Sequence, residues 1–169
     1  GLMSPIWLRG PDAGRRMNTL YYGDEIPPII TDCMLNPRHR LPLWEMVYHD
    51  CTVSYWYWGD SSNGCPELMP VRDLFNALYG LPPLYSLNVT QWRQLRTVVA
   101  ASYRRAAAVA EKVGLLPMTA FEWLTEDRLV QRTVFGGEYA VTVNFSNRPY
   151  ETPQGTIQPL DFRLEELNK

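Results

Sequence analysis

A change of pattern near Pro117 constrains this 169-residue chain more than any other feature. Before it, short apolar runs alternate with segments of helical spacing, which is typical of βα units. After it, four runs rich in β-branched and aromatic residues follow one another without an intervening helix, over residues 118–124, 128–135, 138–146 and 160–165. We therefore expect a domain boundary near residue 116, with a βα-type part over 1–116 and a small antiparallel β-domain over 117–169.

The first part is expected to hold four short strands, over residues 3–9, 41–48, 51–58 and 84–87. The run 41–48 is apolar on both alternating faces except at Glu45, which suits a strand of a parallel sheet covered on both sides. Residues 15–40 are rich in Pro and Asp and show no clean period, so we expect a long loop with room for one short helix. Loops of that length are usually functional.

Two helices are expected in the same part. Apolar residues recur at helical spacing over 67–79, and Gly80 ends this helix. A second, longer helix begins after Asn88, because Asn88 and Gln91 form a capping-box pattern, and it ends at Gly114. Its inner stripe is expected to comprise Trp92, Leu95, Val99, Tyr103, Ala106, Val109 and Val113.

The β-domain has one clear turn, Gly136-Gly137, which predicts a hairpin between its second and third strands. Tyr139, Val141 and Val143 alternate with smaller or polar neighbours, so we expect one face of that strand to be buried. The predicted fold class is therefore α/β plus all-β: the C-terminal portion of a (β/α)8 TIM-type barrel, followed by a small antiparallel β-sandwich. A complete (β/α)8 barrel needs about 250 residues, and residues 1–116 supply only about three of its eight units. Because a partial barrel leaves open sheet edges, the missing N-terminal part of the barrel is an expected partner.

Composition excludes several function classes. The net charge of -2 lacks the basic footprint of a nucleic-acid binder, and no apolar run is long enough to cross a bilayer. The cysteines Cys33, Cys51 and Cys65 form no Cys-x-x-Cys pair, so we expect isolated buried or half-buried thiols rather than a disulfide framework. A zinc site built on His49 and Cys51 would lack further ligands at suitable spacing. We expect no metal and no cofactor.

Candidate site residues lie where the expected strands end, since barrel enzymes place their active sites at the C-terminal ends of strands. Sugars carry many hydroxyls and apolar C–H faces, so proteins bind them with flat aromatic rings beside side chains that form several hydrogen bonds. These requirements select Asp12, His49 and Asp50, and the aromatic segment with Trp56, Trp58 and Asp60.

Each of these candidates also has a structural alternative. Trp56 and Trp58 would share one face of a strand, so they can equally fill a core. His49 and Asp50 are adjacent and would point to opposite sides of a strand, so at most one of them would face the barrel mouth. The structural alternative for these two residues is a polar strand end that makes structural hydrogen bonds. His39 is expected to be a solvated loop residue.

Residues 41–50 (Leu-Pro-Leu-Trp-Glu-Met-Val-Tyr-His-Asp), followed by 55–60 (Tyr-Trp-Tyr-Trp-Gly-Asp), resemble the late-barrel segment of bacterial glycoside hydrolases related to endo-α-N-acetylgalactosaminidases. The resemblance continues through residues 72–80 and 82–85, resumes at 124–133, and ends in 141–146, which is similar to the β-domain behind many glycosidase barrels. It covers most of residues 41–165 and is specific in the His-Asp and Trp-Gly-Asp stretches. Residues 10–14 look like a degenerate Gly-Ser-Glu-Gly-Gly turn in which Asp12 replaces the longer acid.

The resemblance implies a carbohydrate substrate and a pocket-lining role. In such enzymes the nucleophile and the acid lie on earlier barrel strands, so His49 or Asp50 would bind sugar hydroxyls, with Trp56 or Trp58 as a stacking wall near Asp60. The leading hypothesis is a glycosidase fragment that is inactive alone. The alternatives are a non-catalytic carbohydrate-binding module, an interaction subunit that completes its barrel with another polypeptide, and an enzyme using Asp50 or Asp12 as its own catalytic carboxylate.

Overall fold

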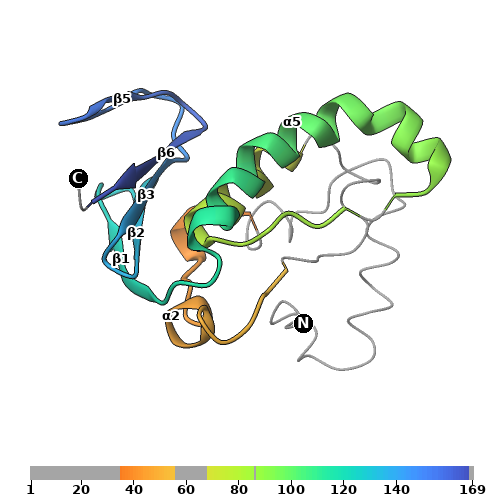
Figure 1. Ribbon diagram of the computed structural model, residues 1–169. Coiled ribbons are helices and arrows are strands. Elements are labelled where there is room, and N and C mark those ends of the chain that lie inside the picture. Colours follow the sequence, from red (N-terminus) through yellow and green to blue (C-terminus); the bar gives the residue numbers. More distant parts are fainter. Residues whose placement is uncertain (1–34, 56–67, 86, 168–169) are drawn as a thin grey trace.

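The computed structural model describes residues 35–55, 68–85 and 87–167, which are coloured in Figure 1. In this part the helical elements come first and the strands last. Their bounds are η3 (Pro37–His39), α2 (Glu45–Tyr48), α4 (Met69–Tyr79), α5 (Val89–Val113), β1 (Met118–Trp123), β2 (Val130–Phe135), β3 (Tyr139–Asn144), β4 (Tyr150–Thr152), β5 (Gly155–Ile157) and β6 (Asp161–Glu166).

Both expected helices are confirmed, together with the signals that end or begin them. Gly80 follows α4 in the left-handed conformation, at φ +66°, where a glycine avoids the clash that a side chain would bring. At the start of α5, the Asn88 side chain accepts a hydrogen bond from Gln91 N at 2.9 Å, and Asn88 N donates to Gln91 Oε1 at 2.8 Å. This is the capping box that the sequence predicts.

The buried stripe of α5 differs from the expected one at several positions. Trp92 and Tyr103 are exposed, whereas Ser102 is buried. The buried residues follow a three-four spacing along the C-terminal two thirds of the helix: Val99, Ser102, Ala106, Val109 and Val113. A polar residue therefore occupies the middle of the stripe that packs against α4.

The four expected strands of the β-part are confirmed and form one antiparallel sheet in the order β1-β2-β3-β6. The turn between β2 and β3 holds Gly136 and Gly137 at φ +59° and +70°, which explains the two glycines. The connection from β3 to β6 contains a separate hairpin, β4 with β5, that the sequence did not reveal.

Strand β3 is buried on both faces rather than on one. Val141 and Val143 belong to the hydrophobic core, and Thr142 and Asn144 on the other face are buried as well. The amide of Asn144 donates to the carbonyls of Arg148 and Ile157 at 2.7 and 3.2 Å. The segment that carries the β4–β5 hairpin thus folds back over the outer face of the sheet.

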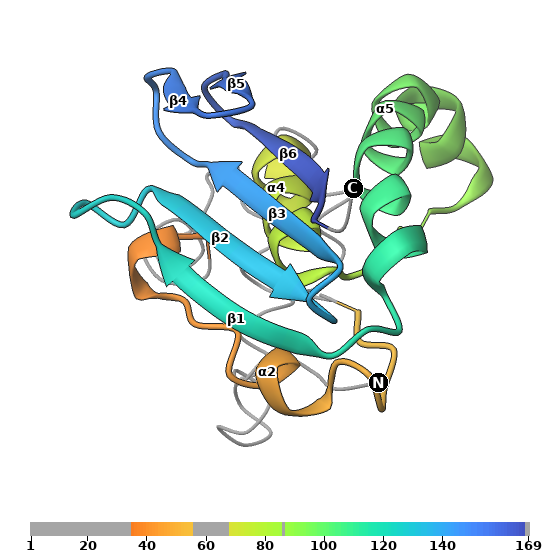
Figure 2. The same ribbon diagram turned by 60° about the vertical axis from the view of Figure 1, so that its left-hand side comes forward.

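Helix α4 lies behind the sheet in Figure 2, and α5 lies beside it. Phe75, Leu78 and Val113 from the helices form one core with Phe135 and Val141 from the sheet. Within the described residues, the two sides of position 117 therefore share a single core. The domain boundary near residue 116 stays a prediction.

The strand expected over 41–48 is wrong, because this stretch forms a turn and the short helix α2. Met46 N donates to Pro42 O at 2.9 Å and Tyr48 N to Trp44 O at 2.9 Å, the i to i−4 pattern of a helix. The rings of Trp44 and Tyr48 lie 4.2 Å apart, as side chains four residues apart on a helix can. A short apolar run fits a buried strand and a buried helix equally well, so its periodicity did not discriminate.

The barrel and the sandwich are not confirmed, although helices combined with an antiparallel sheet are. Before position 117 the described residues contain helices and loops but no strand, including at 51–55 and at 84, 85 and 87. The expected strand at 3–9 and residues 56–58 lie outside the described residues. The β-part is one sheet with a helix on its inner face plus a two-stranded hairpin. In the described part of the chain, no helix has the length and apolar character needed to span a membrane.

Candidate functional site

His49 lies at the end of α2 with its ring turned inward. The side chain is only 4% exposed, and its Nδ1 lies 2.6 Å from the carbonyl oxygen of Leu116. The ring centroid lies 5.0 Å from that of Phe135. These contacts join α2 to the connection between α5 and β1. His49 therefore makes structural contacts, which is the alternative role considered for it in the sequence analysis.

Asp50, the next residue, faces solvent. Its Oδ1 accepts a hydrogen bond from the Cys51 thiol at 3.2 Å. This hydrogen bond to Asp50, together with the negative charge of the same carboxylate, raises the pKa of the exposed Cys51 thiol. The helical turn therefore buries His49 and exposes Asp50, so the structure does not bring these two candidates together.

The other predicted site residues, Asp12, Trp56, Trp58 and Asp60, lie outside the described residues. Tyr55, which directly precedes the aromatic segment, lines a groove of about 730 Å³. The groove combines aromatic and small apolar side chains with Arg104 and Glu111, and its lining is Val53, Tyr55, Pro82, Pro83, Tyr103, Arg104, Ala107, Ala108, Ala110, Glu111, Gly114 and Leu115.

A buried polar cluster between α4 and α5 was not predicted. Arg72 and Asp73 on α4 are each 2% exposed. Ser102 of α5 donates to Asp73 Oδ1 at 2.6 Å, and the Tyr85 hydroxyl lies 2.6 Å from Ser102 Oγ. The Arg72 guanidinium lies over the Tyr85 ring, 5.3 Å from its centroid. The sequence signal that could have revealed this cluster is Ser102, a polar residue between Val99 and Ala106 on the buried stripe of α5.

Burial shifts the titration of this cluster. Desolvation raises the pKa of Asp73, while the Ser102 hydrogen bond and the charges of Arg72 and Arg105 act in the opposite direction. Desolvation likewise lowers the pKa of Arg72, against the attraction of Asp73. Since the charged form of each group is disfavoured by burial, the cluster is a source of pH-dependent stability.

We expect the free energy of unfolding to depend on pH through Asp73. Because the folded-state pKa is raised above its ordinary value of 3.8, the contribution of Asp73 is fully present below that value and is lost as pH rises through the folded-state pKa. Asp73→Asn keeps an acceptor for Ser102 and removes the titration. Urea unfolding between pH 3.5 and 7 should show wild type losing stability relative to Asp73→Asn as pH rises. A constant difference between the two proteins would contradict this.

Two of the described carboxylates form ion pairs that join secondary-structure elements. Glycoside hydrolysis by the common mechanisms needs two carboxyl groups that flank the scissile bond. Here Asp161 of β6 forms an ion pair with Arg105 of α5 at 2.9 Å. Glu165 of β6 lies 4.0 Å from Arg132 of β2. Among the residues that the structure describes, no three His, Cys, Asp or Glu side chains are grouped to hold a metal ion.

A family model and several solved structures match this chain. Residues 17–134 match the family model for glycosyl hydrolases related to the GH101 family, GH129. Among solved structures, the chain is similar to the ligand-free alpha-N-acetylgalactosaminidase NagBb from Bifidobacterium bifidum, with 28% identity, a TM-score of 0.43, and coverage of 65% of this chain and 17% of that one. For the GalNAc complex of that enzyme, the identity is 23% and the TM-score is 0.43, with coverage of 72% of this chain and 20% of that one. The chain thus spans at most a fifth of the length of these structures. No curated protein matched the sequence.

Proposed function

This chain belongs to the GH129 glycosyl hydrolases, which are related to the GH101 family, and from that premise we propose that it is a C-terminal segment of an enzyme cleaving O-glycosidic bonds of glycans. In this proposal the segment contributes residues that line the substrate pocket, while the main catalytic carboxylates belong to another part of the enzyme. The family match supports it, as it includes the described helices together with β1 and most of β2.

The distribution of exposed apolar side chains carries the fragment proposal. Of the fifteen large hydrophobic side chains exposed in the described residues, twelve lie before position 117. They occupy two stretches: Leu41, Leu43, Met46, Val47, Tyr48, Val53 and Tyr55 in the first, and Val89, Trp92, Val98, Tyr103 and Leu115 on and just after α5. Concentrated apolar surface of this kind marks an interface, so we propose that the rest of the catalytic domain covers it.

Helix α5 has the geometry of a helix that continues beyond its present partners. It extends away from the sheet in Figure 1, and its buried residues begin only at Val99. In a (β/α)8 barrel the helices form an outer ring around strands that lie inside. We place α5 in that ring, with the strands that it covers contributed by other parts of the enzyme.

The pocket-lining role is assigned to the segment that follows α2. Asp50 is exposed at its start, and Tyr55 lines the groove beside α5. We propose that Asp50, Trp56, Trp58 and Asp60 contact sugar from this segment. His49 would act beside them by anchoring the segment, which its hydrogen bond to the Leu116 carbonyl supports.

The test is an activity assay with and without the remaining barrel. The chain alone should not hydrolyse aryl α-N-acetylgalactosaminides, chosen because the similar Bifidobacterium enzyme is named for that sugar, or mucin-type glycans. Co-expression with the N-terminal portion of a GH129 enzyme should yield a complex with measurable turnover. Robust turnover by the chain alone would contradict the proposal.

A matched pair of variants tests the surface itself. Trp92→Ala removes an exposed aromatic side chain and should weaken the complex at least tenfold, while the melting temperature of the isolated chain stays unchanged. Gln94→Ala, at an exposed position two residues further along α5 that points to a different side of the helix, should leave the affinity within about twofold. If both variants bind as wild type does, α5 is not the interface.

The groove beside Tyr55 favours one alternative, a carbohydrate-binding module without catalysis. Calorimetric titration of the isolated chain with glycans distinguishes the two functions. Strong binding that Trp58→Ala abolishes, combined with no activity in any co-expressed complex, would favour the binding module over the enzyme segment.

A further inference from the structure

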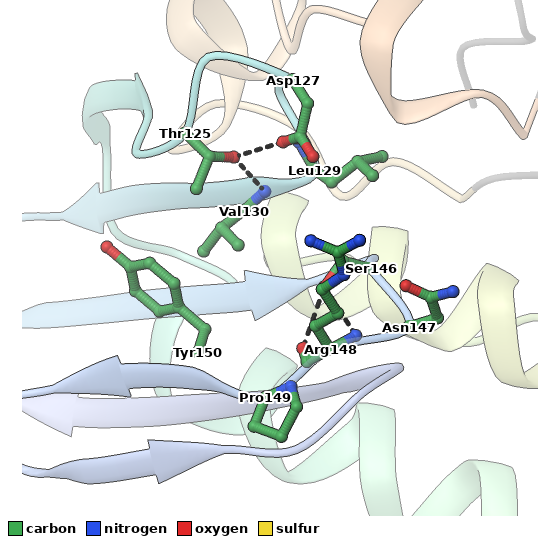
Figure 3. A pocket seen from close by; sticks show the side chains of 9 residues that line it. All are labelled: Thr125, Asp127, Leu129, Val130, Ser146, Asn147, Arg148, Pro149 and Tyr150. Carbon is green, nitrogen blue, oxygen red and sulfur yellow. Dashed lines mark hydrogen bonds between the residues drawn. The ribbon is translucent and has the colours of Figure 1, made fainter.

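A second pocket lies where the turn between β1 and β2 faces the connection between β3 and β4 (Figure 3). Its volume is about 330 Å³, at the lower end of the range for small-molecule sites. It is lined by Thr125, Asp127, Leu129, Val130, Ser146, Asn147, Arg148, Pro149 and Tyr150. Part of this lining, residues 146–150, lies beyond the segment that matches the family.

Internal hydrogen bonds fix the upper wall of the pocket, as drawn in Figure 3. Asp127 Oδ1 accepts from the Thr125 hydroxyl at 2.7 Å and from Leu129 N at 3.0 Å. The Thr125 hydroxyl also accepts from Val130 N at 3.1 Å. The Thr125 hydrogen bond is the main reason that the pKa of Asp127 is lowered, followed by the Leu129 amide. The carboxylate is therefore held in place and ionised at neutral pH.

A buried asparagine fixes the lower wall. Asn144 is fully buried, and its amide donates to Arg148 O at 2.7 Å. The Ser146 hydroxyl lies 2.7 Å from Asn144 Oδ1 and 2.9 Å from Arg148 O. These bonds hold the backbone of the loop, so the side chains it carries are presented from a rigid support, as a binding site requires.

The functional groups that face the pocket retain hydrogen-bonding capacity. Both hydrogen bonds to Asp127 end on Oδ1, and within the described part of the chain Oδ2 accepts none. The hydrogen bonds of Arg148 to described residues use its backbone, which leaves its guanidinium for a ligand. Tyr150, Pro149 and Leu129 add aromatic and apolar surface.

We propose that this pocket is a subsite for one neutral sugar unit of the glycan, separate from the pocket in which the bond is cleaved. Asp127 can accept hydrogen bonds from sugar hydroxyls, and the guanidinium of Arg148 can donate to sugar oxygens. Apolar surface beside these groups suits the C–H face of a pyranose. The opposite charges of Asp127 and Arg148 favour a neutral ligand. The identification of the ligand as a sugar rests on the proposed function.

The test is a titration of the full chain with N-acetylgalactosamine, followed by amide chemical shifts in NMR. Saturable shifts are expected at the amides of Thr125, Leu129 and Ser146. Asp127→Asn and Arg148→Met should each weaken binding at least fivefold, whereas Glu126→Gln, an exposed neighbour outside the lining, should not. Glucuronic acid and glucosamine should bind more weakly than the neutral sugar.

Unchanged affinity in both pocket variants, no saturable shift, or tighter binding of a charged sugar would overturn the subsite. Unfolding curves for Arg148→Met that match wild type exclude a folding defect as the cause of lost binding. Loss of sugar binding in the pocket variants, with unfolding curves that match wild type, supports the subsite. Absence of turnover in the wild-type co-expressed complex bears only on the proposed function.

Discussion

Gly80→Ala is expected to destabilise the chain by about 2–5 kcal/mol, combining about 1–2 kcal/mol for a left-handed backbone and about 1–3 kcal/mol for overpacking. Gly80 has φ +66°, and an added Cβ would lie 2.7 Å from His49 Nε2, 2.8 Å from Val113 Cγ2 and 3.0 Å from Phe135 Cε1. His49 is held by the Leu116 carbonyl, and Val113 and Phe135 are fully buried, so none of the three can move aside cheaply.

Gly137→Ala is the matched control. Gly137 has a similar φ of +70° with no atom within 4 Å of an added Cβ, so this variant should lose only about 1–2 kcal/mol of backbone strain. Urea unfolding of both variants separates strain from packing. If Gly80→Ala lowered the free energy of unfolding by no more than Gly137→Ala does, the close packing of α2, α5 and the sheet around Gly80 would be incorrect.

Phe75→Ala is expected to cost about 3–5 kcal/mol, as truncations of buried Phe do. Phe75 is fully buried on α4, its ring centroid 4.7 Å from that of Phe145 after β3 and 5.9 Å from that of Tyr79. Since its contacts join helix and sheet, we expect the far-UV helical signal and the sheet amide protection to be lost in one transition, at a lower denaturant concentration than in wild type.

Tyr103→Ala serves as the control for this experiment. Its side chain is 58% exposed, so truncation should change the stability of the isolated chain by no more than about 0.5 kcal/mol. If Phe75→Ala unfolded the helices while the sheet kept its wild-type midpoint, the parts on either side of residue 116 would be independent domains. Coincident transitions would instead show one cooperative unit.

Features with a local cause were predicted well. The Asn88 and Gln91 capping box depends on residues three apart, and Gly136 and Gly137 satisfy a backbone requirement of their own turn. Apolar periodicity located α4 and the four sheet strands for the same reason. Residues 41–48 were misassigned as a strand because an apolar run of eight residues is compatible with the periodicity of a strand and with that of a helix. In the structure this stretch contains the short helix α2, which packs near β1.

Site residues whose environment comes from distant segments were harder to predict. His49 was chosen for its imidazole, yet its hydrogen bond reaches Leu116, 67 residues away. Asp73 and Ser102 are 29 residues apart and meet only because α4 and α5 pack together. The pocket of Figure 3 joins two turns that follow different strands, so neither turn alone marks it as a site.

By itself, the amino-acid sequence determined the positions of α4, α5 and the four sheet strands to within two residues at each end, because caps, turns and periodicity act over a few residues. It also revealed the family resemblance. Only the tertiary structure decided that His49 is buried while Asp50 faces solvent, that Ser102 completes a polar cluster, and that one core spans position 117. Burial and electrostatic environment depend on which distant segments pack together, and local sequence does not encode that choice.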